Sequence, residues 1–262
     1  MYLPFGPVSY FSAHMTDISY VVGLVASHRA TCCLFMTFLL LHAFRNLWFG
    51  VYALGSCAHF GVGYLLYVVS CALSFTGYSL PRSNVSYHAI VVIVSLVGSL
   101  LPFYSQGFIR LVFGAQMPEG SHNQMMRLEL LHIFLAHFVL VLILFHLHIL
   151  HLDLSSAGVM EETQGNSSLY GGYLLMDLVL FLWSLFILVQ VIYSLRDRTG
   201  THEMHWVKAD PLKTPNHMRP EYYFLHFYAV LRSVHYKGVG IMFLGWMMTL
   251  VVYDVVSTQH TR

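Results

Sequence analysis

The sequence predicts an all-α, polytopic membrane protein, and three observations lead to this fold class. Of the 262 residues, 57% are hydrophobic and only 10% are charged, whereas soluble domains carry about 25% charged residues. The mean hydropathy is +0.64. Apolar runs long enough to cross about 30 Å of hydrocarbon recur along the chain. Because helices satisfy their own backbone hydrogen bonds in lipid, these runs are expected to be helices.

Five runs are expected to span the membrane, and a shorter one is expected to lie at its surface. The spans are Val21–Leu47, Val51–Gly77, Leu128–His151, Leu174–Tyr193 and Val239–Val256. The shorter run, Tyr87–Leu101, covers about half a span, which favours an interfacial or re-entrant helix. The polar stretch Leu195–Arg219 is expected to lie outside the membrane. Residues 1–262 are therefore interpreted as a single membrane domain.

Charge and cysteine usage exclude other classes of protein. A net charge of +1 provides no basic field for nucleic acid. The N-terminus lacks the regions of a cleaved signal peptide, so insertion is expected to depend on the spans. The four cysteines form no CxxC pattern and are expected to be buried free thiols. They are Cys32, Cys33, Cys57 and Cys71.

Two histidine pairs carry the clearest indication of chemistry. His28 and His42 lie in the first span, and His132 and His146 lie in the third with the same separation in sequence. This separation is a rise of about 21 Å and falls within roughly 40° of whole helical turns, so each helix presents two imidazoles on one stripe. If Tyr87–Leu101 lies on the surface, the first and third spans run in the same direction.

Parallel helices with equal spacing can bring His28 to His132 and His42 to His146. Each pair can supply two axial nitrogens to one planar metal macrocycle, so the pattern predicts two bis-histidine haems at two depths in the membrane. Iron with two protein ligands has no open site for oxygen, which suits electron transfer.

The spacing leaves alternatives open. His137 and His151 offer a rival register with the same separation, and proton relays or interhelical hydrogen bonds also use histidines in membranes. His132 and His146 are preferred because they lie further inside the apolar run.

Glycines repeat at the same interval in the second span. The separation of Gly63 and Gly77 equals that of the two residues in each histidine pair. They suit a macrocycle that approaches the backbone, although glycine is also frequent at helix contacts in membranes.

The segment Asp210–Ser233, DPLKTPNHMRPEYYFLHFYAVLRS, resembles the quinol-oxidation region of the cytochrome b family. Pro220-Glu221-Tyr222-Tyr223 stands where the family usually has proline-glutamate-tryptophan-tyrosine. Further matches are His42-Ala-Phe-Arg45-Asn-Leu-Trp-Phe-Gly50, Gly77-Tyr-Ser-Leu-Pro81, Arg127 and His151. The resemblance covers nearly the whole chain.

The resemblance implies the cytochrome b subunit of quinol:cytochrome c reductase, respiratory complex III, with two haem b groups. The implied iron ligands are His28 and His132 nearer the quinol-oxidation site, and His42 and His146 nearer the quinone-reduction site. Further implied cofactor-binding residues are Gly63, Gly77 and Arg45. Electrons would pass from ubiquinol through the haems to ubiquinone at the other face, which contributes to proton translocation.

The resemblance also implies two quinone sites. Glu221 would accept a hydrogen bond and then a proton from quinol, because a carboxylate in a low-dielectric pocket can act as a base. The other residues implied at the oxidation site are Tyr223, Tyr228, Tyr87 and Ala89. Those implied at the reduction site are His151, Ser155 and Asp177.

Several positions depart from the family pattern, which affects both quinone pockets and one haem contact. This chain has Tyr222 and Arg82 where the family has tryptophan, and Ser83 and Ala89 where it has glycine. It has Met176 where the family often has lysine, and Val25 where it often has arginine.

The resemblance implies a shortened or split version of the family, lacking its first helix and its last two helices. Separate polypeptides are expected to supply the missing helices, and a degenerate copy is the competing interpretation. Residues 1–160 are expected to form the haem-binding part and residues 161–262 the quinone-site part. Plastid-type relatives, which are split after the third span, are disfavoured because the chain continues unbroken through Asp177 and Glu221.

The implied partners are a Rieske iron–sulfur protein, a cytochrome c1-type subunit and other complex III subunits in a dimeric complex, within a lipid membrane. The mitochondrial inner membrane is expected, and a bacterial plasma membrane stays open. The chain has no cluster ligands or c-type haem motif, so it is expected to be inactive alone. Two alternatives, a histidine-relay proton transporter and a non-redox membrane scaffold, both predict no haem.

Overall fold

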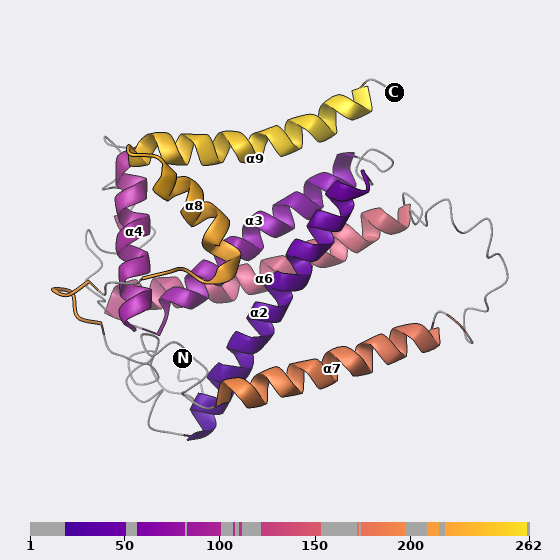
Figure 1. Ribbon diagram of the computed structural model, residues 1–262, viewed down its shortest axis with the longest axis horizontal. Coiled ribbons are helices and arrows are strands. Elements are labelled where there is room, and N and C mark those ends of the chain that lie inside the picture. The colour runs from indigo at the N-terminus through magenta and orange to yellow at the C-terminus, as the bar shows by residue number, and fades with distance from the viewer. Residues whose placement is uncertain are drawn as a thin grey trace.

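The computed structural model describes residues 19–50, 57–81, 83–100, 107, 110–111, 122–152, 172, 174–196, 209–214 and 218–260. Helices account for most of this part of the chain (Figure 1). The long helices are α2 (Ser19–Trp48), α3 (Cys57–Ser79), α4 (Asn84–Leu100), α6 (His122–Leu152), α7 (Leu174–Arg196) and α9 (Lys237–His260). The short 3-10 helix η6 (Tyr222–Phe224) leads into α8 (Leu225–Ser233). The predicted all-helical membrane fold is therefore confirmed.

Three helices within the described residues are long and apolar enough to cross a membrane. They cover Ser27–Trp48, Ala58–Ser79 and Met125–Leu152, which correspond to the first three predicted spans. The fourth and fifth predicted spans are the helices α7 and α9, whose qualifying apolar stretches, Leu174–Gln190 and Lys237–Leu250, are shorter. That α7 and α9 also cross the membrane stays a prediction.

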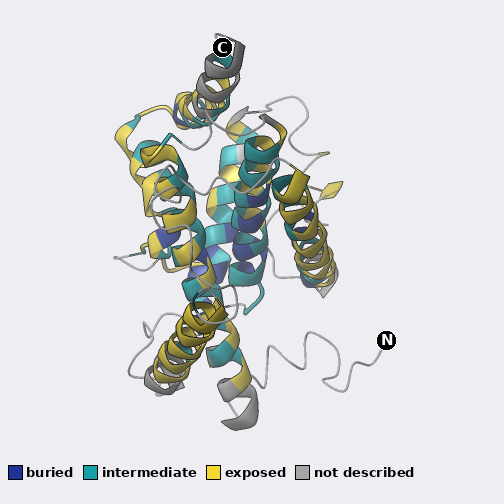
Figure 2. Cartoon of the chain, turned by 90° about the vertical axis from the view of Figure 1, so that its right-hand side faces the viewer, coloured by how far each residue is buried: buried dark blue, intermediate teal, exposed yellow. Residues whose placement is uncertain are grey.

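The helices α3 and α6 form the centre of the described structure. They make the most extensive contact between any two elements there, and Leu66 of α3 packs against Val139 and Leu142 of α6. Ser70 and Ser74 are also buried on α3, and small residues of this kind let membrane helices approach closely. Figure 2 shows the buried residues gathered along these central helices, with exposed residues outside.

The helix α4 begins at a serine cap and crosses the ends of the central pair. The hydroxyl of Ser83 accepts a hydrogen bond from the Ser86 amide at 3.3 Å, and its carbonyl accepts one from the Tyr87 amide at 3.0 Å. Such a cap satisfies amides that the first turn leaves unpaired. Ile90 packs against Leu128 near the start of α6. Figure 1 shows α4 running upright from the left-hand ends of α3 and α6 to the start of α9.

The directions of α2, α3 and α6 determine which helix ends lie on the same side of the bundle. In Figure 1 the starts of α2 and α6 lie towards one side of the molecule and their ends towards the other, so the two helices run in the same sense. Between them the chain returns through α3. Large apolar side chains along α7 are exposed on all its faces, as is typical of a helix placed in lipid or against another protein.

Candidate functional site

The imidazoles of His28 on α2 and His132 on α6 face each other across the bundle; we call this pair the first tier. Their ring centroids are 6.3 Å apart and the ring planes meet at 87°. The rings meet in a T-shaped arrangement. Helix bundles build their cofactor sites from side chains on facing helices in this way, so this pair could hold a cofactor metal.

The second nitrogen of His132 is already engaged by α3. Its Nδ1 lies 3.1 Å from the Leu73 carbonyl oxygen and 3.1 Å from the hydroxyl oxygen of Thr76, and Thr76 itself donates to the Leu73 carbonyl at 2.8 Å. Because a carbonyl only accepts, Nδ1 carries the proton and Nε2 keeps its lone pair. A hydrogen bond to one ring nitrogen thus selects the other nitrogen as the ligating one.

Two glycines of α3 make room for the imidazoles of α6. A Cβ atom added at Gly77 would lie 2.6 Å from Cε1 of His132, and one added at Gly63 would lie 3.1 Å from Cε1 of His146. A contact of 2.6 Å is closer than real side chains come, so Gly77 leaves a space that any other residue would close. Both glycines therefore stand at the level of a histidine, as their spacing predicts.

The second tier contains three imidazoles. His146 stacks on His59 of α3, with ring centroids 4.4 Å apart and planes at 27°. His42 of α2, the expected partner of His146, lies within electrostatic range of both rings and contacts the Asn46 side chain at 3.3 Å. The second tier thus brings together one imidazole each from α2, α3 and α6.

The rival histidine register lies on the outer surface of α6. His137 is exposed and its Nδ1 contacts the Ile133 carbonyl of its own helix at 2.8 Å. His151 is exposed at the end of α6. The imidazoles that lie against α3 are instead those of His132 and His146, which favours the preferred register.

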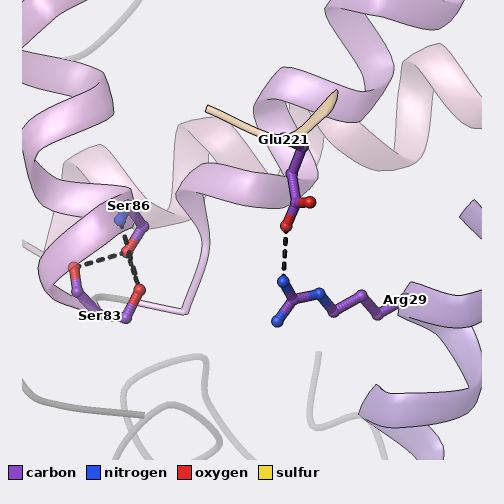
Figure 3. A network of polar contacts seen from close by, with 4 residues as sticks. All are labelled: Arg29, Ser83, Ser86 and Glu221. Carbon is purple, nitrogen blue, oxygen red and sulfur yellow. Dashed lines mark hydrogen bonds and ion pairs between the residues drawn. The ribbon is translucent and has the colours of Figure 1, made fainter. Parts of the chain in front are cut away.

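The expected proton acceptor, Glu221, is held against α2. Its Oε1 lies 2.6 Å from Nη2 of Arg29, the residue after His28 (Figure 3). Tyr223 is buried at 5% exposure, and burial, followed by the nearby Glu221 carboxylate, raises the pKa of its hydroxyl. Tyr223 is therefore a neutral hydrogen-bonding group beside the carboxylate.

The remaining residues expected at the oxidation site lie on α4 and α8. Tyr87 and Ala89 are partly buried on α4, and Tyr87 meets the ring of His88 edge-on at a centroid distance of 5.2 Å. Tyr228 of α8 accepts a hydrogen bond from Arg232 at 3.0 Å.

Two of the three residues expected at the reduction site lie on described helices, at the end of α6 and at the start of α7. His151 ends α6, and Asp177 occupies the first turn of α7, where it is exposed. Ser155 lies outside the described residues. Arg45 is exposed in the last turn of α2, with its guanidinium 6.0 Å from the centre of the Phe49 ring.

Sequence reasoning missed three residues that the structure brings to these sites: Arg29, His59 and Thr76. Arg29 had a signal, because a charge inside an apolar span is costly and usually functional. His59 precedes Gly63 by about one helical turn, so it lies on the same face of α3. Thr76 gave no signal, since a threonine in a helix is ordinary.

A helical membrane bundle that brings imidazoles from separate helices together belongs to the class of helix bundles that can build a cofactor site from facing helices. Two family models match the chain: "Cytochrome b(N-terminal)/b6/petB" over residues 33–202 and "Cytochrome b(C-terminal)/b6/petD" over residues 208–261. The chain therefore belongs to the cytochrome b family. Membership in this family implies b-type haem as the prosthetic group.

Individual relatives agree with the family assignment. The chain is 28% identical over 250 residues to cytochrome b of Mycena viridimarginata, covering 95% of this chain and 63% of the relative. It is 31% identical over 239 residues to cytochrome b of Mytilus edulis, covering 89% and 57%. Cytochrome b of Rickettsia prowazekii (strain Madrid E) is 28% identical over 253 residues, with 95% and 62% covered. The chain thus spans about 63% of the Mycena relative's length.

The fold has a counterpart among solved structures. A chain of a hyperthermophilic respiratory complex III superposes with a TM-score of 0.76 at 20% sequence identity, covering 97% of this chain and 69% of that one. At this identity the likeness establishes the fold, which is that of a multi-pass helical membrane protein.

Proposed function

We propose that this chain is the cytochrome b subunit of a ubiquinol:cytochrome c reductase. The observation that carries the proposal is the first tier. There, His28 and His132 face each other at 6.3 Å, Nε2 of His132 is left for a metal by the Leu73 carbonyl, and Gly77 leaves the space in which the imidazole lies. These features fit a haem whose iron His28 and His132 would hold.

The residues proposed to hold the two haems are His28 with His132 and His42 with His146. The haems, when bound, supply one-electron carriers on the path between the two membrane faces. The protein's own contribution is to fix the ligating nitrogens and to keep the tiers about 21 Å apart along the helices. Gly63 and Gly77 leave room for the rings, and Arg45 is proposed to contact the second haem.

Proton chemistry is proposed for residues at both ends of the bundle. Glu221 would accept the proton of a bound quinol, with Tyr223 and Tyr228 orienting the quinol ring, and with Tyr87 and Ala89 lining the pocket. His151, Ser155 and Asp177 would deliver protons to quinone at the other end. Release on one side and uptake on the other would contribute to a proton gradient across the mitochondrial inner membrane.

The proposed partners are those that the resemblance to cytochrome b implies, and a chain of a respiratory complex III shares the fold. A Rieske iron–sulfur protein and a cytochrome c1-type subunit would accept electrons, within a dimeric complex III whose other subunits complete it. Residues 1–160 would bind haem and residues 161–262 would complete the quinone sites, and the isolated chain would not turn over.

A difference spectrum tests the proposal directly. The dithionite-reduced minus oxidised spectrum of the purified membrane complex is expected to contain a b-type α band, and pyridine haemochrome analysis is expected to give two haems per chain. Absence of a b-type band would refute the proposal and would favour a histidine-relay transporter or a non-redox scaffold.

A further inference from the structure

An ion pair joins two functional regions that are far apart in the sequence. Nη2 of Arg29 and Oε1 of Glu221 are 2.6 Å apart, across 192 residues of chain. The two side chains are 27% and 17% exposed, so water screens the contact only in part. Charge-assisted hydrogen bonds of this length are the strong ones in proteins. The pair therefore fixes the carboxylate relative to α2.

The same face of α2 also binds Tyr222, the residue that follows Glu221. The Tyr222 hydroxyl donates to the Cys33 carbonyl and lies 2.5 Å from the Thr37 hydroxyl. Arg29, Cys33 and Thr37 are spaced by four, so they form one stripe along the helix. A tyrosine hydroxyl both donates and accepts, whereas a tryptophan N–H only donates. Tyr222 thus completes a second attachment point.

The stripe lies beside the first tier. Arg29 directly follows His28, about 100° further round the helix. One turn of α2 therefore carries both His28 and the cation that holds Glu221. Figure 3 shows the Arg29 guanidinium reaching from α2 to the Glu221 carboxylate. The chain thereby couples the position of the carboxylate to the helix that carries His28.

We propose that Arg29 is a positioning residue that anchors the Glu221 carboxylate beside the first tier for proton abstraction from quinol. This inference rests on the proposed function. Small misplacements of a catalytic group cost large factors in rate, and a base must lie within hydrogen-bond reach of the proton that it accepts. Arg29 itself does not touch quinol, so its effect passes through Glu221.

The experiment compares variants in the complete membrane complex. Arg29→Gln removes the cation, Arg29→Lys keeps it, and Lys213→Gln removes one positive charge at an exposed position outside α2. Glu221→Gln and the double variant with Arg29→Gln complete a double-mutant cycle. Quinol-dependent turnover is measured with kcat and KM separated, after the difference spectrum has confirmed that each variant retains its haems.

Arg29→Gln is expected to lower kcat by about tenfold or more while KM changes by less than about twofold, because the lost contact orients the base and not the substrate. Arg29→Lys is expected to recover kcat to within about threefold of the parent chain. The double variant should be no slower than Glu221→Gln alone. An unchanged kcat in Arg29→Gln, a Lys variant as slow as the Gln variant, or fully additive losses would each overturn the inference.

A second measurement does not depend on turnover. Hydrogen exchange of the peptide that contains residues 218–226 should accelerate about tenfold in Arg29→Gln relative to Lys213→Gln, because the ion pair and the Phe224 amide bond to the Glu221 carbonyl at 2.9 Å order this segment. Equal exchange rates would overturn the anchoring. The two ideas fail separately: a missing b-type band removes the proposed function, whereas normal haems with unaltered exchange and kcat remove only the role of Arg29.

Discussion

Single residues decide where the imidazoles of α6 can lie. His132 contacts α3 at a point where the helix has no side chain, and a Cβ at Gly77 would lie 2.6 Å from its ring. The nearby Leu73 carbonyl then chooses which nitrogen keeps the proton. The position and the tautomer of the His132 imidazole thus come from two residues of a neighbouring helix, and the backbone of each makes the contact.

Substitution of Gly77 by alanine is the direct test of this space. Overpacking of this kind typically costs about 1–3 kcal/mol, and here the displaced group is the His132 ring. We expect Gly77→Ala to lose about half of the bound haem, as measured by pyridine haemochrome per chain. The matched control is Gly61→Ala on the same helix, where an added Cβ meets nothing within 4 Å. Equal haem content in the two variants would contradict the prediction.

At the scale of elements, single polar contacts attach α8 and α9 to α3. Tyr67 of α3 meets Nε2 of His226 on α8 at 3.0 Å, and Tyr64 of α3 donates to the Met248 carbonyl of α9 at 3.2 Å. The segment before α8 is attached to α2 through Glu221. The elements after residue 209 therefore dock on the helices of the two tiers, which positions the proposed quinol pocket.

The attachment of α8 is expected to depend on pH. Desolvation lowers the pKa of His226 below its ordinary value of 6.5, so the released helix binds a proton more readily than the docked one. Docking of α8 should therefore be complete above pH 6.5 and should weaken as the pH falls below that value. Hydrogen exchange of residues 225–233, corrected for the intrinsic rate, measures this between about pH 5 and 8.

A glutamine at the same position supplies the control. His226→Gln retains a polar side chain able to bond Tyr67 but does not titrate in this range. Its corrected exchange rate should be independent of pH. If the parent chain and this variant respond alike to acid, another group is responsible.

At the scale of the whole molecule, the alternating direction of the helices determines which segments share a membrane face. The ends of α2, α6 and α9 lie towards one side in Figure 1, and α4 and the segment 209–214 lie towards the other. The proposed quinol-oxidation residues before and within α8 gather on the α4 side. The expected quinone-reduction residues at the end of α6 and the start of α7 lie on the opposite side.

Labelling of single introduced cysteines tests this topology. Leu212 and Trp48 are 97% and 73% exposed and lie at opposite ends of the bundle. In sealed vesicles of one orientation, a membrane-impermeant maleimide should label only one of Leu212→Cys and Trp48→Cys, and vesicles of the opposite orientation should reverse the result. The unsubstituted chain controls for its own thiols. Labelling of both positions from one side would show that they do not lie on opposite faces of the membrane.

Much of this architecture follows from local properties of the chain. Composition and apolar runs predicted a helical membrane protein, because lipid permits few other ways to satisfy a backbone. The interval shared by the histidine and glycine pairs placed them on common levels, because the helical repeat is fixed. The Pro220–Tyr223 tetrad identified the family before any contact was known. These features depend on residues close in sequence, or on one helix at a time.

Contacts between helices required the tertiary structure. Nothing local links Arg29 to Glu221, 192 residues away, or places His59 rather than His42 against His146. Such pairings depend on how helices rotate and cross, which packing over the whole bundle determines. The sequence by itself determined the helices, their levels and the family. Only the folded chain decided which imidazoles, which cation and which carboxylate meet, because those contacts arise where separate helices pack together.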